Sequence, residues 1–184
     1  GMTTPDPVLL QSQFRRFVEQ GLRACAIEAS SIGVAERRLD GTRIKVAIFT
    51  NFTHDHLDYH GSMAAYWLAK AELFAWPGLQ AAVVNMDDPK GDSIVRALAG
   101  TGVDLWTVSS RGPARLQASD VGYDAQGLSF TVVEGHATHR LQTGLVGQYN
   151  VSNLLGVLGA MRAVGVPLGA AVRACSALPP VPGR

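Results

Sequence analysis

Cysteine, charge and long apolar runs are all scarce in this chain of 184 residues. The two cysteines, Cys25 and Cys175, are too few for a disulfide scaffold or a cysteine-rich metal site. Both lie in apolar surroundings and are predicted to be buried thiols, so we expect a reducing compartment, the cytoplasm. With 17% charged residues and a net charge of +1, neither nucleic acid nor a membrane surface is expected as a partner. No apolar run reaches the roughly 20 residues that cross a bilayer.

Short apolar runs alternate with helix-like stretches before residue 110. Buried strands are predicted at 23–28, 45–51, 81–87 and 104–109. Helices are predicted beside them at 7–20, 62–76 and 91–99. This alternation favours an α/β fold with a mostly parallel central sheet flanked by helices.

The first predicted helix has the clearest boundary signals. Asp6 is a good N-cap, Pro7 suits the first helical position, and Gly21 suits the C-terminal end. The apolar stripe expected along its buried side consists of Leu10, Phe14, Phe17 and Val18.

The pattern changes after residue 110. Polar and apolar residues alternate over 116–143, with turn signals at 124–127 and 134–135. These features predict a small antiparallel meander of two or three strands at the edge of the sheet. Two further helices are expected at 150–164 and 168–178.

Polar residues follow three of the predicted strands at their carboxyl ends. Glu28 ends the first strand, Asn51 the second, and the pair 87–88 the third. Ligands of an open α/β sheet bind at this edge. We therefore expect Glu28 and the histidines after Asn51 to share one rim.

The segment NFTHDHLDYHG, at 51–61, holds three histidines and two aspartates between His54 and His60. One interpretation is a dinuclear zinc hydrolase of the metallo-β-lactamase type, whose signature is H-x-H-x-D-H. Tyr59 occupies the place of the last histidine, and that fold needs later histidines, which only the turn-rich stretch 136–139 offers. A plainer interpretation is that the histidines are ordinary surface-loop residues.

A third interpretation rests on resemblance to a known family. The segments EASS at 28–31, NFTHDHLDYHG at 51–61, YWLAKAELF around Lys70, GQYNVSNLL at 147–155 and PVPGR at 180–184 occur in this order. Together they resemble the central domain of the Mur ligases, in particular the branch that adds the third residue of the peptidoglycan stem. TTPDP near the start and RRLDG at 37–41 also suit that branch.

The resemblance implies an ATP-dependent ligase that forms an amide bond. In such an enzyme a substrate carboxylate attacks the γ-phosphate of ATP to give an acyl phosphate, and an amine then displaces phosphate. Mg²⁺ neutralises phosphate charge while the two anions approach. The implied substrates are a UDP-N-acetylmuramoyl-dipeptide and an amino acid, either diaminopimelate or lysine, and the implied cofactors are ATP and Mg²⁺.

The resemblance also implies which residues lie near Mg²⁺. Glu28 and His56 are expected to bind it, and Glu28 is a suitable hard oxygen ligand. In the full-length enzyme Lys70 is expected to carry a carbamate that holds a second Mg²⁺, so Lys70 and His56 are the expected catalytic residues. In the 184-residue chain alone Lys70 is expected to be largely unmodified. A neutral lysine amine can add carbon dioxide, and partial burial would favour the neutral amine.

Each of these assignments has a plain alternative. Helical spacing places Lys70 on an apolar stripe with Met63, Trp67 and Phe74. An unmodified Lys70 would lie along that stripe and extend its ammonium group to water. Glu28 would instead be a helix cap or an ion-pair partner.

The remaining residues implied by the resemblance are expected to contact the UDP-muramoyl-peptide and ATP. Those expected to hold the UDP-muramoyl-peptide are Thr3, Thr4, Ser30, Glu36 and Arg38. Hydroxyls and a guanidinium suit carboxylate, amide and sugar groups. Two positions depart from the family pattern: Ile32 stands where histidine is common, and Glu36 stands where glutamine is common and would repel an anionic ligand.

Asn150 and Asn153, at a predicted helix start, resemble the pair that faces the nucleotide ATP. Simple helix capping is the alternative for Asn150. The phosphate-binding string G-x-x-G-K-[ST], which a Mur ligase needs before the threonine pair, does not occur in this sequence.

These observations lead us to expect that residues 1–184 are a truncated central, ATP-binding domain. The N-terminal UDP-binding domain, the phosphate loop and the C-terminal amino-acid-binding domain would then lie elsewhere in a longer protein. The alternative from another class is a short, non-catalytic protein that binds a nucleotide sugar.

Overall fold

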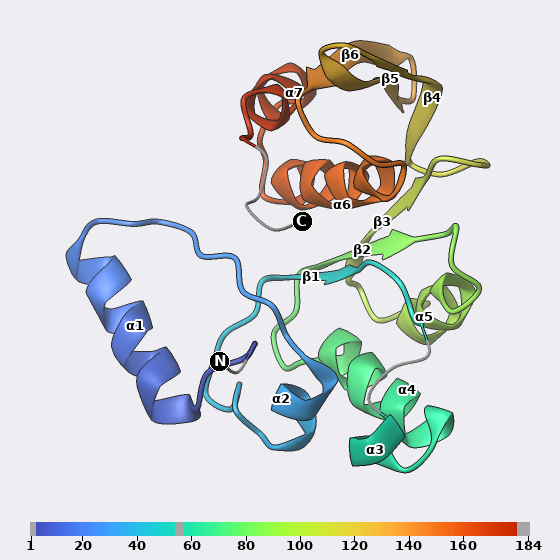
Figure 1. The fold of residues 1–184 in the computed structure, drawn as a ribbon. Helices are drawn as coiled ribbons and strands as arrows, with labels where there is room; N and C mark the ends of the chain where they lie inside the picture. The colour runs from blue at the N-terminus through green and yellow to red at the C-terminus, as the bar shows by residue number, and fades with distance from the viewer. Residues whose placement is uncertain (1–2, 54–56, 180–184) are drawn as a thin grey trace. The chain divides into compact units, whose positions relative to one another are not determined.

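The computed structural model, which describes residues 3–53 and 57–179, divides into two units (Figure 1). The helical unit comprises Gly1–Ile44 and Thr53–Gly78. The sheet unit comprises Lys45–Phe52 and Leu79–Arg184. None of the helices in the described ranges is long and apolar enough to cross a membrane.

The sheet unit contains a six-stranded sheet whose strands follow one another in sequence order. Its parallel part consists of β1 (Val46–Phe49), β2 (Ala81–Asn85), β3 (Asp104–Ser109) and the start of β4 (Leu116–Asp124). Its antiparallel part consists of β4, β5 (Gly127–Glu134) and β6 (Ala137–Thr143). The predicted α/β class, the mostly parallel sheet and the meander of three strands are therefore confirmed.

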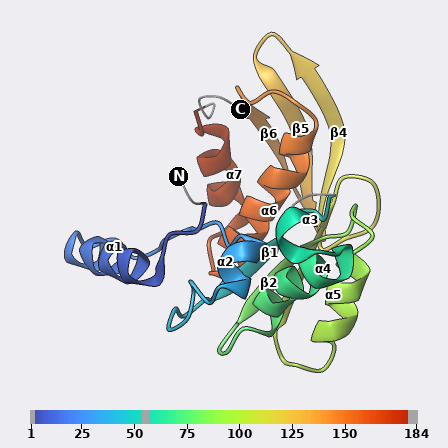
Figure 2. The same cartoon turned by 60° about the horizontal axis from the view of Figure 1, so that its bottom comes forward.

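Helices α5 (Gly91–Leu98), α6 (Tyr149–Ala163) and α7 (Leu168–Ser176) pack on this sheet. Helix α6 lies against the parallel strands, and α7 lies against β6 (Figure 2). All five residues of β2 are buried, as expected for a continuous apolar run covered on both faces. Gly159 of α6 allows the close approach to β2, because a Cβ there would lie 2.7 Å from Val83 Cγ1.

The helical unit contains α1 (Pro7–Glu19), α2 (Ser31–Ala35), α3 (Leu57–His60), α4 (Met63–Glu72) and the short 3₁₀ helix η1 (Leu73–Ala75). The predicted ends of α1 are confirmed. Asp6 Oδ1 accepts a hydrogen bond from Leu9 N at 3.0 Å, and Gly21 adopts φ +76° directly after the helix. Leu10 is buried on the predicted stripe, but Val18 is 66% exposed, so its inclusion in that stripe was wrong.

The predicted strand at 23–28 is wrong. These residues have no regular secondary structure, all are exposed, and no strand of the described part pairs with them. An apolar run forms a strand only where a neighbouring strand satisfies its backbone N–H and C=O groups. Glu28 therefore does not end a strand, and the strand on which its predicted place at the rim rested is absent from the described residues.

The two cysteines have different environments. Cys175 on α7 is buried, as predicted, and burial raises the pKa of its thiol to about 11. Cys25 is exposed, so the prediction of a buried thiol at this position was wrong. The cause is the same as for the strand, because Cys25 lies in the segment that pairs with no strand.

Candidate functional site

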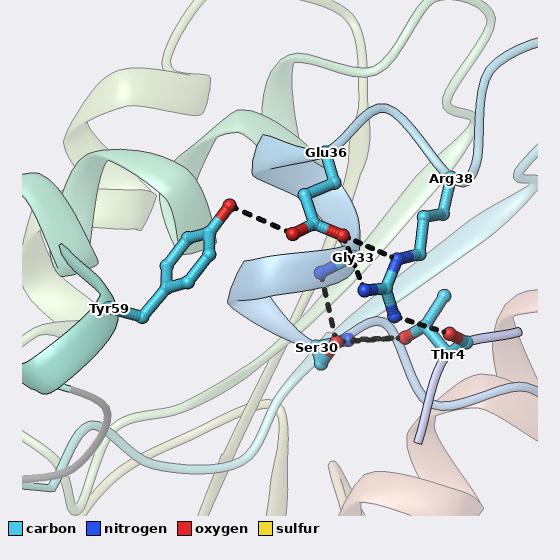
Figure 3. A network of polar contacts seen from close by, with 6 residues as sticks. All are labelled: Thr4, Ser30, Gly33, Glu36, Arg38 and Tyr59. Atoms are coloured by element: carbon cyan, nitrogen blue, oxygen red, sulfur yellow. Dashed lines mark hydrogen bonds and ion pairs between the residues drawn. The ribbon is translucent and has the colours of Figure 1, made fainter. Parts of the chain in front are cut away.

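Thr4 is fully buried and holds the segment before α2 in place (Figure 3). Its hydroxyl donates to the backbone oxygen of Glu28 at 2.8 Å and accepts from Ser30 N at 2.9 Å. The Ser30 hydroxyl lies 3.0 Å from Thr4 Oγ1 and caps α2 by accepting from Gly33 N at 3.0 Å. The structure therefore brings two predicted substrate residues together, with their hydroxyls bonded inside the chain.

Thr3 is placed differently from Thr4. It is exposed and lines a cavity of about 240 Å³, together with Leu10, Phe17 and Glu28. A hydroxyl in an open cavity remains able to bond an external polar group. Of the two threonines, Thr3 is thus the one whose surroundings suit a direct ligand contact, and that contact stays a prediction.

Arg38 and Glu36 form an ion pair at the end of α2. Arg38 Nε donates to Glu36 Oε2 at 2.8 Å, and Nη2 contacts the same oxygen. Arg38 Nη1 donates to the backbone oxygen of Thr4 at 2.9 Å. The negative charge of Glu36 is therefore compensated locally, which weakens the repulsion expected between this residue and an anionic ligand.

Tyr59 adds a third residue to this pair. Its hydroxyl donates to Glu36 Oε1 at 3.2 Å. Desolvation of the phenol raises the pKa of Tyr59, and the charge of Glu36 and the hydrogen bond to it raise that pKa further. The Tyr59 hydroxyl therefore stays protonated, and able to donate, at physiological pH.

The residues expected near Mg²⁺ are only partly described. Glu28 is exposed, and its carboxylate is the kind of hard oxygen ligand that Mg²⁺ takes. His56 lies outside the described residues. Within residues 3–53 and 57–179, no group of three histidine, cysteine or acidic side chains is placed to hold a metal ion. The exposed carboxylate of Glu28 is the one observed feature that suits Mg²⁺, which needs few protein ligands when water and phosphate oxygens complete its coordination.

Lys70 lies near the end of α4 and is partly buried. Its Nζ lies 5.4 Å from the centroid of the buried Tyr66 ring. Met63 and Trp67 are also partly buried and Phe74, in η1, is buried, but the buried residues of α4 itself are Tyr66 and Ala69. An ammonium group over an aromatic face is a stabilised cation, so this geometry suits unmodified Lys70, and the carbamate stays a prediction.

His60, the last histidine of the cluster, has a packed position. Its ring stacks on Tyr66 with centroids 5.4 Å apart, and its Nε2 lies 3.0 Å from Ser31 Oγ. These contacts join α3 to both α2 and α4. His60 therefore lies in a helix and contributes to packing within the helical unit, so its interpretation as a surface-loop residue was wrong. His54 lies outside the described residues.

Asn150 and Asn153 lie in the first turns of α6. Asn150 Nδ2 donates to the backbone oxygen of Val146 at 2.7 Å, and Asn153 Nδ2 lies 3.3 Å from Asn150 Oδ1. The helix cap is Gln148, so capping of α6 by Asn150 was the wrong alternative. Asn153 is exposed, and its contact with ATP stays a prediction.

The carboxyl ends of the parallel strands carry a hydrogen-bonded rim. Asp88 Oδ2 accepts from Phe52 N at 2.7 Å, which joins the segments after β1 and β2. Asp87 accepts from Ser109 Oγ at 2.5 Å and from Ser110 N and Oγ at 2.8 Å. The two serines were not anticipated, since serine after a strand is an ordinary turn residue.

Tyr59 and Gly33 were also missed as parts of the site. Tyr59 stands inside the histidine cluster and was treated there only as a mismatch to the zinc signature. Gly33 did leave a signal, because glycine inside a five-residue helix lowers helix stability unless another group needs the space. A Cβ at Gly33 would lie 2.7 Å from Thr4 Cβ and 2.8 Å from Thr4 Oγ1.

We expect Gly33→Ala to displace Thr4 and to lower the free energy of unfolding of the purified chain by about 1–2 kcal/mol. The added methyl group overlaps a fully buried side chain that already makes three polar contacts. Urea denaturation measures the change. Gly112→Ala is the matched control, because a Cβ at Gly112 meets no atom within 4 Å. Equal stability of the two variants would contradict the packing described for Thr4.

The family to which this fold belongs follows from comparison with known proteins. Residues 1–161 match the model of the Mur ligase middle domain. The chain belongs to this family. Membership confirms the resemblance stated from the motifs and argues against the zinc-hydrolase interpretation of the histidine cluster.

Two relatives of this Mur ligase middle domain share a name. A UDP-N-acetylmuramoyl-L-alanyl-D-glutamate–2,6-diaminopimelate ligase from Acidovorax sp. (strain JS42) is 64% identical over 184 residues, covering 100% of this chain and 37% of the relative. A protein of the same name from Pseudomonas aeruginosa is 41% identical over 185 residues, covering 99% of this chain and 37% of the relative. The chain thus spans little more than a third of the length of these relatives.

A solved structure supports the same assignment. The structure of a UDP-N-acetylmuramoyl-L-alanyl-D-glutamate–2,6-diaminopimelate ligase superposes with a TM-score of 0.91 at 34% sequence identity. It covers 99% of this chain and 38% of the solved chain. The sheet and helices described above are therefore those of a Mur ligase.

Proposed function

We propose that this chain is the ATP-binding middle domain of a ligase that joins diaminopimelate to UDP-N-acetylmuramoyl-L-alanyl-D-glutamate. The observation that carries the proposal is the 64% identity, over the whole chain, with a relative of that name. The UDP-binding domain, the phosphate loop and the domain that binds the amino acid belong to the rest of the full-length protein. The proposed setting is the cytoplasm.

Diaminopimelate is proposed over lysine on the names of the relatives alone. The Acidovorax and Pseudomonas proteins are both named for that amino acid. Residues of this chain do not argue for either, because the side chain of the incoming amino acid is expected to meet the C-terminal domain.

In the proposed reaction the substrate carboxylate attacks the γ-phosphorus of ATP, the bond between the β- and γ-phosphates breaks, and ADP leaves. The amine of diaminopimelate then attacks the carbonyl carbon of the acyl phosphate. The amide bond forms as phosphate leaves. Bound Mg²⁺ would supply positive charge that offsets repulsion between the carboxylate and the phosphates. The exposed carboxylate of Glu28 would hold that cation, with His56 as a second contact.

The other residues of the chain would bind and orient the two substrates. Thr3 would contact the UDP-muramoyl-peptide from its open cavity, and Arg38 would hold the adjoining Thr4 backbone. Asn153, with Asn150 behind it, would face the nucleotide. Correct placement matters because in-line transfer gains most of its rate from positioning and electrostatics.

We expect the full-length protein that carries this chain to form the tripeptide product from UDP-N-acetylmuramoyl-L-alanyl-D-glutamate, diaminopimelate, ATP and Mg²⁺. Release of phosphate and mass spectrometry of the product measure the reaction. The 184-residue chain alone should not hydrolyse ATP, because it lacks the phosphate-binding string. Absence of product from the folded full-length protein would overturn the proposal, as would ADP formation without amide-bond formation when both acceptor substrates are present.

A further inference from the structure

We propose that Tyr59 is a positioning residue of the substrate site: through Glu36 it fixes Arg38, and through Arg38 it fixes the Thr4 backbone. The inference rests on the proposed function and adds a residue to it that no motif assigned. Tyr59 acts through other residues, since its hydroxyl bonds Glu36 and not one of the threonines.

The two carboxylate oxygens of Glu36 bond different partners (Figure 3). Oε2 accepts both contacts from Arg38, and Oε1 accepts the hydrogen bond from Tyr59 at 3.2 Å. The last torsion of a glutamate side chain is broad, so contacts on one oxygen leave the carboxylate plane free to turn. The Tyr59 hydroxyl, bonded to the second oxygen, restricts that rotation.

The orientation of the Glu36 carboxylate determines that of the Arg38 guanidinium, which in turn bonds the Thr4 backbone. The guanidinium of Arg38 is planar and rigid, so holding its Nε edge also sets the direction of Nη1. Nη1 donates to the backbone oxygen of Thr4 at 2.9 Å. The side chain of Arg38 is only 14% exposed, against 40% for Glu36, so Tyr59 holds the more exposed member of the pair.

Tyr59 is itself anchored by the contacts of α3 with α2. Tyr59 and its neighbour His60, both on α3, reach opposite ends of α2. His60 contacts Ser31, the first residue of α2, and Tyr59 contacts Glu36, the C-cap of α2. The rings of Tyr59 and His60 also meet edge to face at 4.8 Å. Tyr59 is 47% exposed but is nevertheless held in a defined place.

The test uses steady-state kinetics of the full-length protein with UDP-N-acetylmuramoyl-L-alanyl-D-glutamate, ATP and diaminopimelate. We expect Tyr59→Phe to raise the KM for the UDP-muramoyl substrate about three- to tenfold, because the substitution removes one hydrogen bond and a loss of this size is typical of one bond. The KM for ATP and kcat should stay within twofold. Tyr123→Phe is the matched control, because Tyr123 is also about half exposed but lies on β4 in the sheet unit.

A double-mutant cycle separates positioning from an independent effect. Glu36→Ala should raise the KM for the UDP-muramoyl substrate. Adding Tyr59→Phe to it should cause no further change, because Glu36, through which Tyr59 acts on Arg38, is already absent. Additive effects of the two substitutions would overturn the inference. So would a KM for the UDP-muramoyl substrate in Tyr59→Phe that equals that of the wild type.

A direct readout keeps this inference separate from the proposed function. If the wild-type protein forms no product, the proposed function fails. The contact chain is then judged by ¹⁵N NMR of the full-length protein labelled at arginine. We expect Tyr59→Phe to speed exchange of the Arg38 Hε proton with water. Unchanged exchange would show that Tyr59 does not fix Arg38.

Discussion

Lys70→Ala in the full-length protein is expected to lower the rate of amide-bond formation by on the order of 100-fold. The proposed carbamate on Lys70 would replace a cation with an anionic oxygen ligand, and alanine can provide neither group. The carbamate is expected from the family resemblance, since the place of Lys70 beside the ring of Tyr66 on α4 suits the unmodified ammonium group. A small added carboxylate such as formate should restore part of the activity, since it supplies the missing oxygen ligand.

Lys45→Ala is the matched control, because Lys45 is an exposed lysine just before β1. It should retain wild-type activity and should not respond to formate. Wild-type activity of Lys70→Ala without any additive would show that Lys70 only lies along the apolar stripe and reaches water. A loss of activity that formate does not relieve would show that the charge of the lysine itself, rather than a carbamate, is required.

The sheet unit was predictable from sequence because its signals are local. The runs at 45–51, 81–87 and 104–109 each contain the observed strand, and the turn signals at 124–127 and 134–135 mark the two hairpins. Buried parallel strands appear in the sequence as continuous apolar runs. Each strand of this sheet also pairs with the strand that follows it in sequence. Short-range patterns therefore carried the information that the topology needed.

The run at 23–28 carried the same pattern and still failed. Whether such a run becomes a strand depends on a partner strand, and pairing partners cannot be read from the run itself. The predictions that Cys25 and Val18 are buried failed for the same reason, since the burial of a side chain depends on which other elements pack over it. Hydrophobic periodicity shows which face of a helix or strand is more apolar, but it does not show which face is buried by neighbouring elements.

The candidate site was predictable in its residue types and not in its contacts. Motif resemblance selected Thr4, Ser30, Glu36 and Arg38, and the structure places them in one hydrogen-bonded group. The internal hydrogen bonds of Thr4 and the contact of Tyr59 with Glu36 join segments that are distant in sequence, so no local pattern predicts them. Side chains 23 residues apart in sequence, such as Tyr59 and Glu36, meet only once the helices have packed.

Asp87→Ala is expected to lower the free energy of unfolding of the chain by about 2–3 kcal/mol. Asp87 follows β2 and accepts three hydrogen bonds from Ser109 and Ser110 at the end of β3. Ser109 is 2% exposed, and its hydroxyl also accepts from the backbone of Arg111 and Gly112. Removing the carboxylate leaves a buried hydroxyl without its acceptor and releases the loop after β3, which urea denaturation measures.

The pH dependence of this effect distinguishes the carboxylate from simple packing. Burial alone would raise the pKa of Asp87, but hydrogen bonds from Ser109 and Ser110 and the charge of Arg111 outweigh it, and the pKa is lowered. A carboxyl group whose folded-state pKa is depressed stabilises the fold above its unfolded pKa of about 3.9, and that contribution is lost as the pH falls through the folded pKa. Asp87→Asn, which keeps the size of the side chain, should therefore differ most from wild type between pH 5 and pH 7.

We expect the stability difference between wild type and Asp87→Asn to be constant from about pH 7 to pH 5 and to shrink below about pH 4. Asp92→Asn is the matched control: Asp92 is exposed in the first turn of α5, so its replacement should cost no more than about 0.5 kcal/mol. A difference for Asp87→Asn that persists unchanged at pH 3 would contradict the role given to its charge. Protonated Asp87 would then hold Ser109 and Ser110 as well as the charged carboxylate does.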